Sequence, residues 1–359
     1  MSQAAHADAF HRTLPSGHPT GRSSAARHRL TALALVALIA CSAWASAQTP
    51  SALDRVTVTV DGAIPTIIPE VGIVQGIFRE QGLEVAKVFA PKSGEAIQLA
   101  LSGRSHFGFA TAAPLLESAA RGESVVVIGL LSHGFSGKLV ASNANAHLTS
   151  LADFRGKRIA VQKGTGVTTI FLLALENAGL KESDFQIQDV RVFDMPAAMR
   201  GGNFDAVLGW EPGMSRIVDD GHGKEIISNK RFEQLTGTTY PFLLFTSRNL
   251  VDTQPGLVQR FVTAWAKSQV FTRTDRPAAL KVIRNYLGKE VAGVGDGLLE
   301  KLTYIYEYDR AALVEADFAD IRIMSEFMFR QGGIKSRPDM KVFVNNDFAR
   351  QAEALMRRR

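Results

Sequence analysis

The sequence predicts an α/β protein of two lobes, each a mostly parallel sheet flanked by helices, with a cleft between the lobes. Three observations lead to this prediction. Short apolar runs alternate with stretches of helical periodicity, the alternation restarts near the middle of the chain, and one strand-to-helix unit recurs roughly 100 residues later. The chain has 359 residues, which is enough for two domains preceded by a processed segment.

The first half of the chain contains strands and helices in regular alternation. Residues 55–60 alternate polar and apolar side chains, as a half-buried strand does, and residues 69–81 carry apolar residues at helical spacing up to Gly82. The strands expected here are 55–60, 83–89, 107–110 and 124–131, and the helices are 69–81, 93–102 and one that opens at Pro114. This order favours parallel strands joined by helices.

The same order begins again after Asn143. The strands expected here are 158–162, 187–193, 206–209 and 240–246, and the helical segments are 151–157, 166–178, 194–201 and one that begins at Pro212. Beyond residue 246 the pattern is helical, and Leu257, Phe261 and Trp265 fall on one stripe that indicates core packing.

An internal echo links the two halves. A helix, the turn Gly103–His106, a short apolar strand and Pro114 are matched by a helix, the turn Gly202–Asp205, a short apolar strand and Pro212. Because ligands of open α/β sheets bind at the carboxyl ends of strands, two lobes with matching turns predict a cleft between those turns.

The N-terminus predicts export. Arg27-His28-Arg29 precedes eleven uncharged residues, 30–40, and Ala45-Ser46-Ala47 is a small-x-small cleavage site, so residues 1–47 are expected to be a signal peptide. A second interpretation stays open, because Leu38-Ile39-Ala40-Cys41 resembles a lipobox and would make Cys41 the site of lipidation, with the protein held at the membrane surface. Both interpretations place the mature chain outside a bacterial cytoplasm, in the periplasm.

Composition excludes several function classes. Hydrophobic residues make up 46% and charged residues 21% of the chain, as in ordinary globular proteins. The formal charge of +6 comes largely from arginines in the N-terminal segment and from Arg357-Arg358-Arg359, so it gives no evidence for nucleic-acid binding. No motif of a nucleophile elbow, a phosphate-binding loop, a zinc peptidase or another cofactor site is found, and the one cysteine is Cys41. We therefore expect no catalytic residues, no metal and no cofactor.

Several turns present the first residues of a helix to the predicted cleft. Such helix starts offer unpaired N–H groups and a partial positive charge, which suit a small anion. The turn residues expected to bind ligand are Ser93, Thr111, Ala112, Gly164, Thr165, Gly166 and Thr168. Simple capping of each helix is the alternative. Trp210 is expected to form an aromatic wall or to pack in the core, and Glu211 to cap the helix at Pro212 or to accept a hydrogen bond from the ligand.

The stretch from about Arg55 to Arg273 resembles the periplasmic substrate-binding proteins of ABC importers in the nitrate/sulfonate/taurine (NitT/TauT) family. The residues that carry the resemblance are Ser93-Gly94, Phe107-Gly108, the stretch Leu151–Val161 (LADFRGKRIAV), Lys163-Gly164-Thr165, Asp205-Ala206 and Trp210-Glu211-Pro212. The resemblance implies the type II periplasmic-binding-protein fold, with lobe I formed by 52–142 and 243–359, lobe II by 143–242, and crossings near Ser142-Asn143 and Tyr240-Pro241. It also adds Asp61, Gly62, Ala63 and Ile64 to the ligand-binding residues expected from the turns.

The function implied is capture of a small anion, such as a sulfonate, taurine or nitrate, for import through an ABC permease. Two alternatives stay open. One is an exported enzyme of the same fold that acts on a small heterocycle or a sulfur compound, although its relatives use a cysteine and Cys41 lies in the signal region. The other is a periplasmic ligand sensor without its own permease.

Overall fold

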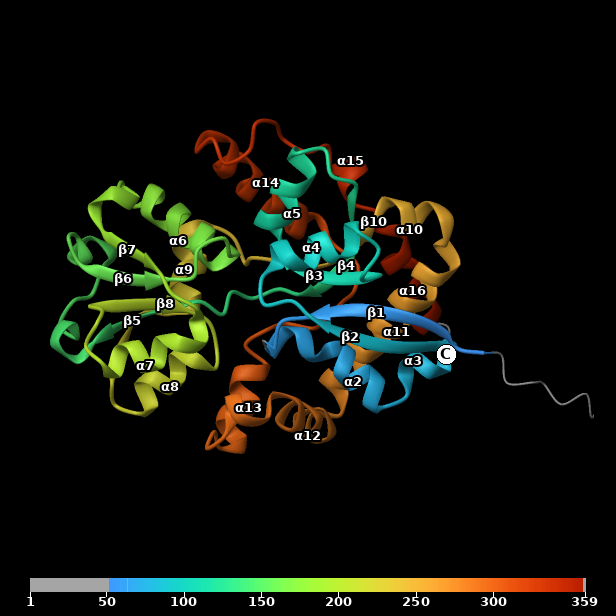
Figure 1. Cartoon of the computed structure of the whole chain (residues 1–359), viewed down its shortest axis with the longest axis horizontal. Coiled ribbons are helices and arrows are strands. Elements are labelled where there is room, and N and C mark those ends of the chain that lie inside the picture. Colours follow the sequence, from blue (N-terminus) through green and yellow to red (C-terminus); the bar gives the residue numbers. More distant parts are fainter. Residues whose placement is uncertain (1–51, 63, 358–359) are drawn as a thin grey trace, which may run out of the picture. The chain divides into compact units, whose positions relative to one another are not determined.

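The computed structural model describes residues 52–62 and 64–357, which form one compact unit (Figure 1). The predicted signal peptide, the lipidation site Cys41 and the predicted site residue Ala63 lie outside the described residues. The unit contains two five-stranded sheets, as the two-lobed prediction requires. None of its helices combines the length and the apolar character needed to cross a membrane.

The first sheet has the strand order β2-β1-β3-β10-β4. β1, β2, β3 and β4 run parallel to one another, and β10 is antiparallel to both of its neighbours, β3 and β4. The bounds are Asp54–Val60 for β1, Leu83–Phe89 for β2, Phe107–Thr111 for β3, Val125–Ser132 for β4 and Phe242–Ser247 for β10. The late strand β10 completes this sheet, so the first lobe is built from two separate stretches of chain.

The second sheet repeats the arrangement with the order β7-β6-β8-β5-β9. β6, β7 and β8 are parallel, and β5 is antiparallel to its neighbours β8 and β9. The bounds are Lys138–Ser142 for β5, Arg158–Val161 for β6, Gln186–Asp189 for β7, Ala206–Gly209 for β8 and Gly223–Ile227 for β9. β3 and β8 hold the same central place in their sheets, which confirms the echo between the two strand-to-helix units.

Helices cover both faces of the first sheet. On one face lie α2, α3, α11 and α16, which bury a cluster that includes Phe78, Phe261 and Trp265. On the other lie α4, α5 and α14 (Figure 1). The bounds are Ile68–Val74 for α2, Ile77–Glu80 for α3, Ser93–Leu101 for α4, Ala112–Ala120 for α5, Arg248–Thr253 for α10, Pro255–Thr274 for α11, Arg276–Leu287 for α12, Asp296–Thr303 for α13, Glu315–Arg330 for α14, Met340–Phe343 for α15 and Asp347–Arg357 for α16.

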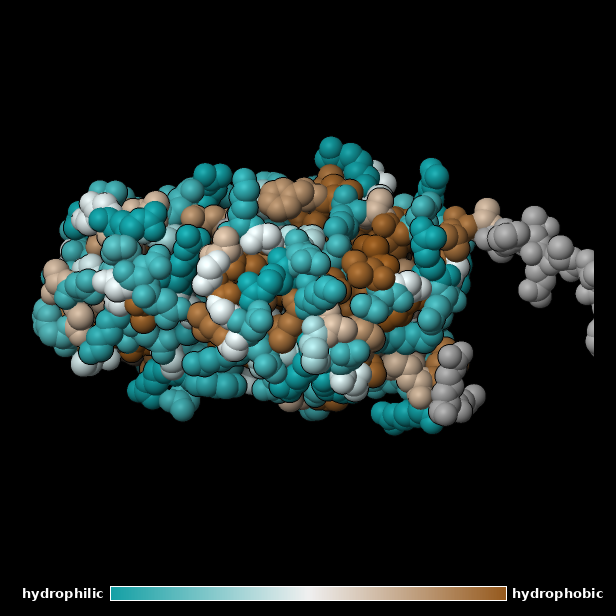
Figure 2. Space-filling model, turned by 90° about the horizontal axis from the view of Figure 1, so that it is seen from below, coloured by the Kyte–Doolittle hydropathy of each residue, from teal (hydrophilic) through white to brown (hydrophobic). Residues whose placement is uncertain are grey.

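The second sheet is covered by α6 and α9 on one face and by α7 and α8 on the other (Figure 1). The bounds are Gly166–Asn177 for α6, Met195–Arg200 for α7, Gly213–Asp219 for α8 and Asn229–Thr236 for α9. Short 3-10 turns complete the chain at Ile64–Ile67, Asn143–Asn145, Leu151–Phe154, Glu182–Asp184, Val192–Asp194 and Gly288–Val291. The face of the unit seen in Figure 2 is mainly hydrophilic, with apolar residues gathered toward its middle.

Three local predictions need correction. The helix expected over 69–81 is broken into α2 and α3, because Gly76 adopts the left-handed conformation between them, with φ of 72°. The strand expected over 187–193 ends at Asp189, and Val192–Asp194 is a 3-10 turn instead. The strands β5 and β9 were not predicted at all.

The lobe boundary expected at Ser142-Asn143 falls at the end of a strand that belongs to the second sheet. Residues 138–142, expected to belong to lobe I, form β5, which pairs with β8 and β9 in the second sheet. We propose that the first crossing is the segment His133–Gly137, which joins β4 to β5, and that the second is Thr238–Pro241, before β10. The two segments touch, since the N–H of Gly134 donates to the carbonyl of Thr239 at 3.0 Å.

Candidate functional site

A pocket lies at the carboxyl ends of parallel strands from both sheets. Its space, including the open mouth, is about 640 Å³. The residues that line it are Asp61, Pro65, Pro91, Lys92, Ser93, Thr111, Gly134, Phe135, Ser136, Thr165, Gly166, Val167, Trp210, Tyr240, Phe242 and Tyr306. The first and second sheets both contribute, and so do the two crossings and the segment after α13.

Three helices begin at this pocket. The helix α4 starts at Ser93, α5 at Ala112 and α6 at Gly166. The residues before α4 and α5, Lys92 and Thr111, make no side-chain capping bond, whereas Thr165 caps α6 by accepting from the N–H of Thr168. The first-turn N–H groups of a helix have no partner within the helix, so this end of the pocket attracts negative charge.

Two buried hydroxyl groups lie beside the start of α6. A Cβ atom on Gly166 would come within 1.0 Å of the Tyr240 hydroxyl and 2.4 Å of Thr111 Oγ1, so both oxygens sit against the backbone of this glycine. Thr111 is 8% and Tyr240 5% exposed. Apart from each other, neither hydroxyl has a hydrogen-bond partner among the described residues. Burial raises the pKa of Tyr240 far above its usual range, so this phenol stays protonated and can donate.

Aromatic side chains form much of the remaining wall. Phe135 makes an edge contact with Tyr240 at 5.6 Å between ring centres, and Trp210 packs against the core of the second sheet. Phe242 is the first residue of β10, and Tyr306 follows α13. The Tyr306 hydroxyl is paired with Ser136, whose side chain also lines the pocket. Such a wall favours ligands with flat apolar surface.

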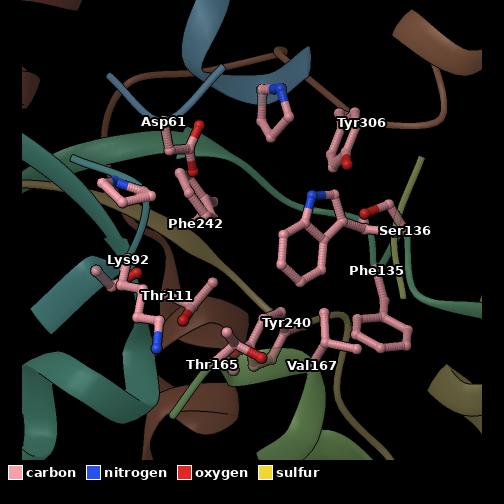
Figure 3. Close-up of a pocket in the computed structure, with 16 residues that line it drawn as sticks. Asp61, Lys92, Thr111, Phe135, Ser136, Thr165, Val167, Tyr240, Phe242 and Tyr306 are labelled. Atoms are coloured by element: carbon pink, nitrogen blue, oxygen red, sulfur yellow. The ribbon is translucent and has the colours of Figure 1, made fainter. Parts of the chain in front are cut away.

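Figure 3 shows how the labelled side chains are distributed around the pocket. Thr111, Thr165 and Tyr240 lie together at one end, and Asp61 and Tyr306 lie at the opposite end. The Asp61 carboxylate accepts a hydrogen bond from the Thr66 hydroxyl at 2.6 Å. Donor groups and an acceptor group therefore occupy different ends of one pocket.

Glu211 lies outside the pocket lining. Its carboxylate is fully buried, accepts from the N–H of Ser215 at 3.0 Å near the start of α8, and pairs with Lys138 at 2.8 Å. Lys138 also pairs with Glu225 at 2.8 Å. Burial alone would lower the pKa of Lys138, but the two carboxylates raise it above its ordinary value. Of the two roles expected for Glu211, its contacts match the one at the start of the helix, and binding of a ligand by Glu211 stays a prediction.

The predicted site residues divide into two groups. Those brought together in the pocket are Asp61, Ser93, Thr111, Thr165, Gly166 and Trp210. Besides Glu211, those that do not line it are Gly62, Ile64, Ala112, Gly164 and Thr168. Ile64 and Ala112 are buried in the apolar core. Gly62 and Gly164 supply positive φ angles in turns, and the Thr168 hydroxyl donates to the carbonyl of Gln162. These five residues shape the turns that carry the pocket residues.

Sequence reasoning missed the aromatic wall apart from Trp210. Phe135 and Tyr240 belong to the crossings, and Tyr306 comes from the C-terminal third of the chain. A single aromatic residue in an irregular segment has no local pattern that separates pocket from core. Pro91 and Lys92 precede Ser93 in a turn that was chosen because a helix starts there. This position next to a helix start was the signal that could have identified both as pocket residues.

Metal binding finds no support in this part of the molecule. Within the described ranges 52–62 and 64–357, no group of three or more His, Cys, Asp or Glu side chains is arranged to hold a metal ion.

Comparison with known proteins agrees with this architecture. A protein of Escherichia coli strain K12 named for aliphatic sulfonate binding is 25% identical over 175 residues, which cover 49% of this chain and 53% of that protein. The chain thus spans about half the length of this curated relative.

Solved structures share the fold. The periplasmic aliphatic sulphonate binding protein SsuA from Escherichia coli aligns with a TM-score of 0.68 and 18% identity, over 81% of this chain and 92% of that one. The desulfurization enzyme DSZB aligns with a TM-score of 0.65 and 16% identity, over 85% of this chain and all of that one, 100%. The two-lobed fold therefore serves both binding proteins and an enzyme.

The family assignment follows from a direct match. The model of the family described as NMT1/THI5 like matches residues 70–279, which is more than half of the chain and includes strands of both sheets. Together with the sulfonate-binding relatives, this match confirms the resemblance seen in the sequence. The chain belongs to the NMT1/THI5-like family.

Proposed function

We propose that this protein is an exported, non-catalytic solute-binding protein that captures a small organic anion in the pocket and delivers it to an ABC permease. The observation that carries the proposal is the convergence of three helix starts, two on the first sheet and one on the second, on one pocket. Because its walls come from both sheets, a ligand held there bridges them, and closure of two lobes on a ligand is a signal that a permease can recognise.

The relatives support the class of ligand. The names of the curated relative from Escherichia coli and of the solved structure SsuA refer to aliphatic sulfonates. A sulfonate is a compact anion whose oxygens accept several hydrogen bonds. The three helix starts can supply several N–H donors to such an anion.

Isothermal titration calorimetry tests the proposal. The purified chain from residue 48 would be titrated with methanesulfonate, butanesulfonate, taurine, nitrate, benzenesulfonate and benzoate. We expect saturable 1:1 binding of at least one of these anions. Absence of binding to all of them would refute capture of a small anion.

A variant locates the binding event. Trp210→Ala should weaken binding by about 1–3 kcal/mol, roughly 5- to 150-fold, because an aromatic wall is removed from the ligand. Phe329→Ala is the matched control, since Phe329 is 37% exposed on α14 and does not line the pocket. Unchanged affinity in Trp210→Ala would place the ligand elsewhere.

Export and processing have their own test. We propose a periplasmic location, and the full chain expressed in a Gram-negative bacterium should be released from the periplasm with Gln48 as its first residue. Mass spectrometry that finds a lipid on Cys41 would instead assign membrane anchoring. Retention of the unprocessed chain in the cytoplasm would contradict export.

The enzyme alternative rests on the shared fold with DSZB. Its test is recovery of the ligand after prolonged incubation with the protein, followed by NMR spectroscopy. A non-catalytic receptor returns the ligand unchanged, whereas conversion to a product would replace the proposed function by an enzymatic one.

A further inference from the structure

The second crossing, Thr238–Pro241, contains a residue with an unusual backbone conformation. Among the described residues, Tyr240 is the one non-glycine with a positive φ angle, 59°. In this left-handed region the side chain of an L residue crowds its own backbone, so the conformation costs free energy and persists only where neighbouring contacts hold it. Tyr240 therefore needs contacts that keep it in this conformation.

The same residue carries a hydroxyl group into the pocket. The Tyr240 side chain lines the pocket, and its hydroxyl lies against Gly166 at the start of α6. Thr111 and Thr165 lie at the same end of the pocket (Figure 3). Because Tyr240 belongs to a crossing and Gly166 to a helix of the second sheet, the hydroxyl stays at this helix start only while the crossing keeps its shape.

A buried carboxylate on α14 holds the two residues before Tyr240. Asp320 is 8% exposed, and one of its oxygens accepts from the N–H of Thr239 at 3.1 Å and from the Thr239 hydroxyl at 2.7 Å. The Thr238 hydroxyl also bonds to Asp320, and it accepts from the N–H of Tyr240 at 3.0 Å. The Asp320 carboxylate is thus connected to the backbone of Tyr240 through one intervening hydroxyl.

The packing of α14 does not by itself explain an acid at this position. Burial raises the pKa of Asp320 above its ordinary value, while the hydrogen bonds from the two threonines favour the charged form. Within the part of the chain that the structure describes, all hydrogen bonds of this side chain go to the second crossing. A carboxylate taken out of water costs free energy unless hydrogen bonds offset the loss, and here the crossing supplies those bonds.

We propose that Asp320 is a positioning residue for the ligand. By holding Thr238 and Thr239, it fixes Tyr240 in the left-handed conformation that keeps the phenol hydroxyl at the start of α6. The inference rests on the proposed function and deepens it, because the hydroxyl placed there serves the captured anion. Asp320 does not line the pocket, so it acts on the ligand only through the crossing.

Calorimetric titration with butanesulfonate and benzenesulfonate compares three variants of the chain from residue 48. Asp320→Ala removes the acceptor and should weaken binding at least tenfold. Asp320→Asn keeps an acceptor oxygen for Thr239 and should bind within threefold of the parent. Glu315→Gln, which changes an exposed carboxylate on the same helix, is the matched control and should bind like the parent. Equal losses in Asp320→Ala and Asp320→Asn, or no loss in either, would contradict the role of these hydrogen bonds.

A double-mutant cycle with Tyr240→Phe tests whether Asp320 acts through the phenol hydroxyl. Tyr240→Phe keeps the ring and removes the hydroxyl, so it should itself weaken both sulfonates. In that background, Asp320→Ala should cost less than a further threefold in affinity, because the group that it positions is already absent. The same loss in both backgrounds would show that Asp320 acts by another route and would overturn the inference.

NMR spectra of isotope-labelled tyrosine, recorded without ligand, follow Tyr240 directly. The chain has five tyrosines, and the signal of Tyr240 is identified by its absence from Tyr240→Phe. It should move in Asp320→Ala and keep its position in Asp320→Asn and Glu315→Gln. If Asp320→Ala does not fold, Thr239→Val takes its place, since it removes one of the bonds to Asp320 at an exposed position and should move the signal as well.

Failure of the inference is distinct from failure of the proposed function. If the sulfonates bind and the Tyr240 signal stays in place when the bonds to Asp320 are removed, the inference falls and anion capture stands. If no anion of the earlier panel binds, the proposed function falls, together with the service of Tyr240 to an anion.

Discussion

Gly166 leaves less room for a Cβ atom than any other glycine of the described residues. A Cβ atom there would overlap the Tyr240 hydroxyl and crowd Thr111. We predict that Gly166→Ala weakens anion binding at least tenfold and lowers the free energy of unfolding by about 1–3 kcal/mol, the usual cost of overpacking. Calorimetry and urea unfolding measure the two effects.

A matched glycine separates this steric effect from a general effect of alanine. Gly256 lies in the first turn of α11 without a positive φ angle, and a Cβ atom added there would meet no atom of the described residues within 4 Å. Gly256→Ala should therefore leave binding intact and raise stability by about 0.4–1 kcal/mol. Equal behaviour of the two alanine variants would contradict the close approach described for Gly166.

His106 should make stability depend on pH. Its Nδ1 accepts a hydrogen bond from the N–H of Thr57 at 3.1 Å, and burial lowers the pKa of the ring below its ordinary value. The unfolded chain therefore takes up a proton at a higher pH than the folded chain. Stability is full above an unfolded pKa of about 6.5 and falls as the pH drops toward the folded value.

Urea unfolding at pH 7.5 and pH 5.5 measures this contribution. We predict that the parent chain loses more stability over this interval than His106→Asn, because asparagine can accept the same hydrogen bond without binding a proton. His147→Asn, at an exposed position, is the matched control for removal of a histidine. The same pH dependence in the parent and His106→Asn would contradict the prediction.

At the scale of elements, a buried ion pair ties three parts of the second sheet together. Lys138 at the start of β5 contacts Glu211 before α8 and Glu225 in β9. Removal of the cation would leave the fully buried Glu211 carboxylate without its charged partner. We predict that Lys138→Met lowers the free energy of unfolding by about 3–5 kcal/mol.

The double variant Lys138→Met/Glu211→Gln checks the reason for that loss. It removes the uncompensated charge, so thermal and urea unfolding should show that part of the stability returns. A double variant less stable than Lys138→Met would show that the buried charge is not the cause.

The elements themselves were predictable to different degrees. The parallel strands and their helices have strong local signals, namely apolar runs and glycine or proline at their ends. β5 and β9 lack such signals, because KLVAS and GKEII are short and the alternation in them is weak. Their identity depends on antiparallel pairing with each other and with β8, which no local pattern encodes.

At the scale of the whole molecule, ligand binding should draw the two sheets together. Groups from both sheets line the pocket. The ion pair of Glu176 with Arg330, 2.6 Å apart, joins α6, which covers the second sheet, to α14, which covers the first. We predict that saturating ligand lowers the radius of gyration of the mature chain, measured by small-angle X-ray scattering. Identical scattering with and without ligand, at concentrations where calorimetry shows saturation, would contradict closure.

The candidate site was predictable where single turns carry it. Ser93, Thr111, Thr165 and Gly166 were expected there because small and hydroxylated residues at a helix start have a local meaning, and all four line the pocket. Asp61 was found through the family resemblance. Glu211 was expected either to cap the helix at Pro212 or to bind ligand, and it does not line this pocket. A sequence shows that an acid precedes Pro212 but not that Lys138 lies 2.8 Å from it.

The sequence alone determined the α/β class, the repeated strand-to-helix unit and the turns that present helix starts, because each depends on residues close together in the chain. Only the tertiary structure decided where the chain crosses between sheets, and which aromatic side chains join those turns. Phe135, Tyr240 and Tyr306 are far apart in sequence, and their common pocket exists only after both sheets have formed and the crossings have packed against each other. Their placement is a consequence of non-local packing, to which local patterns are blind.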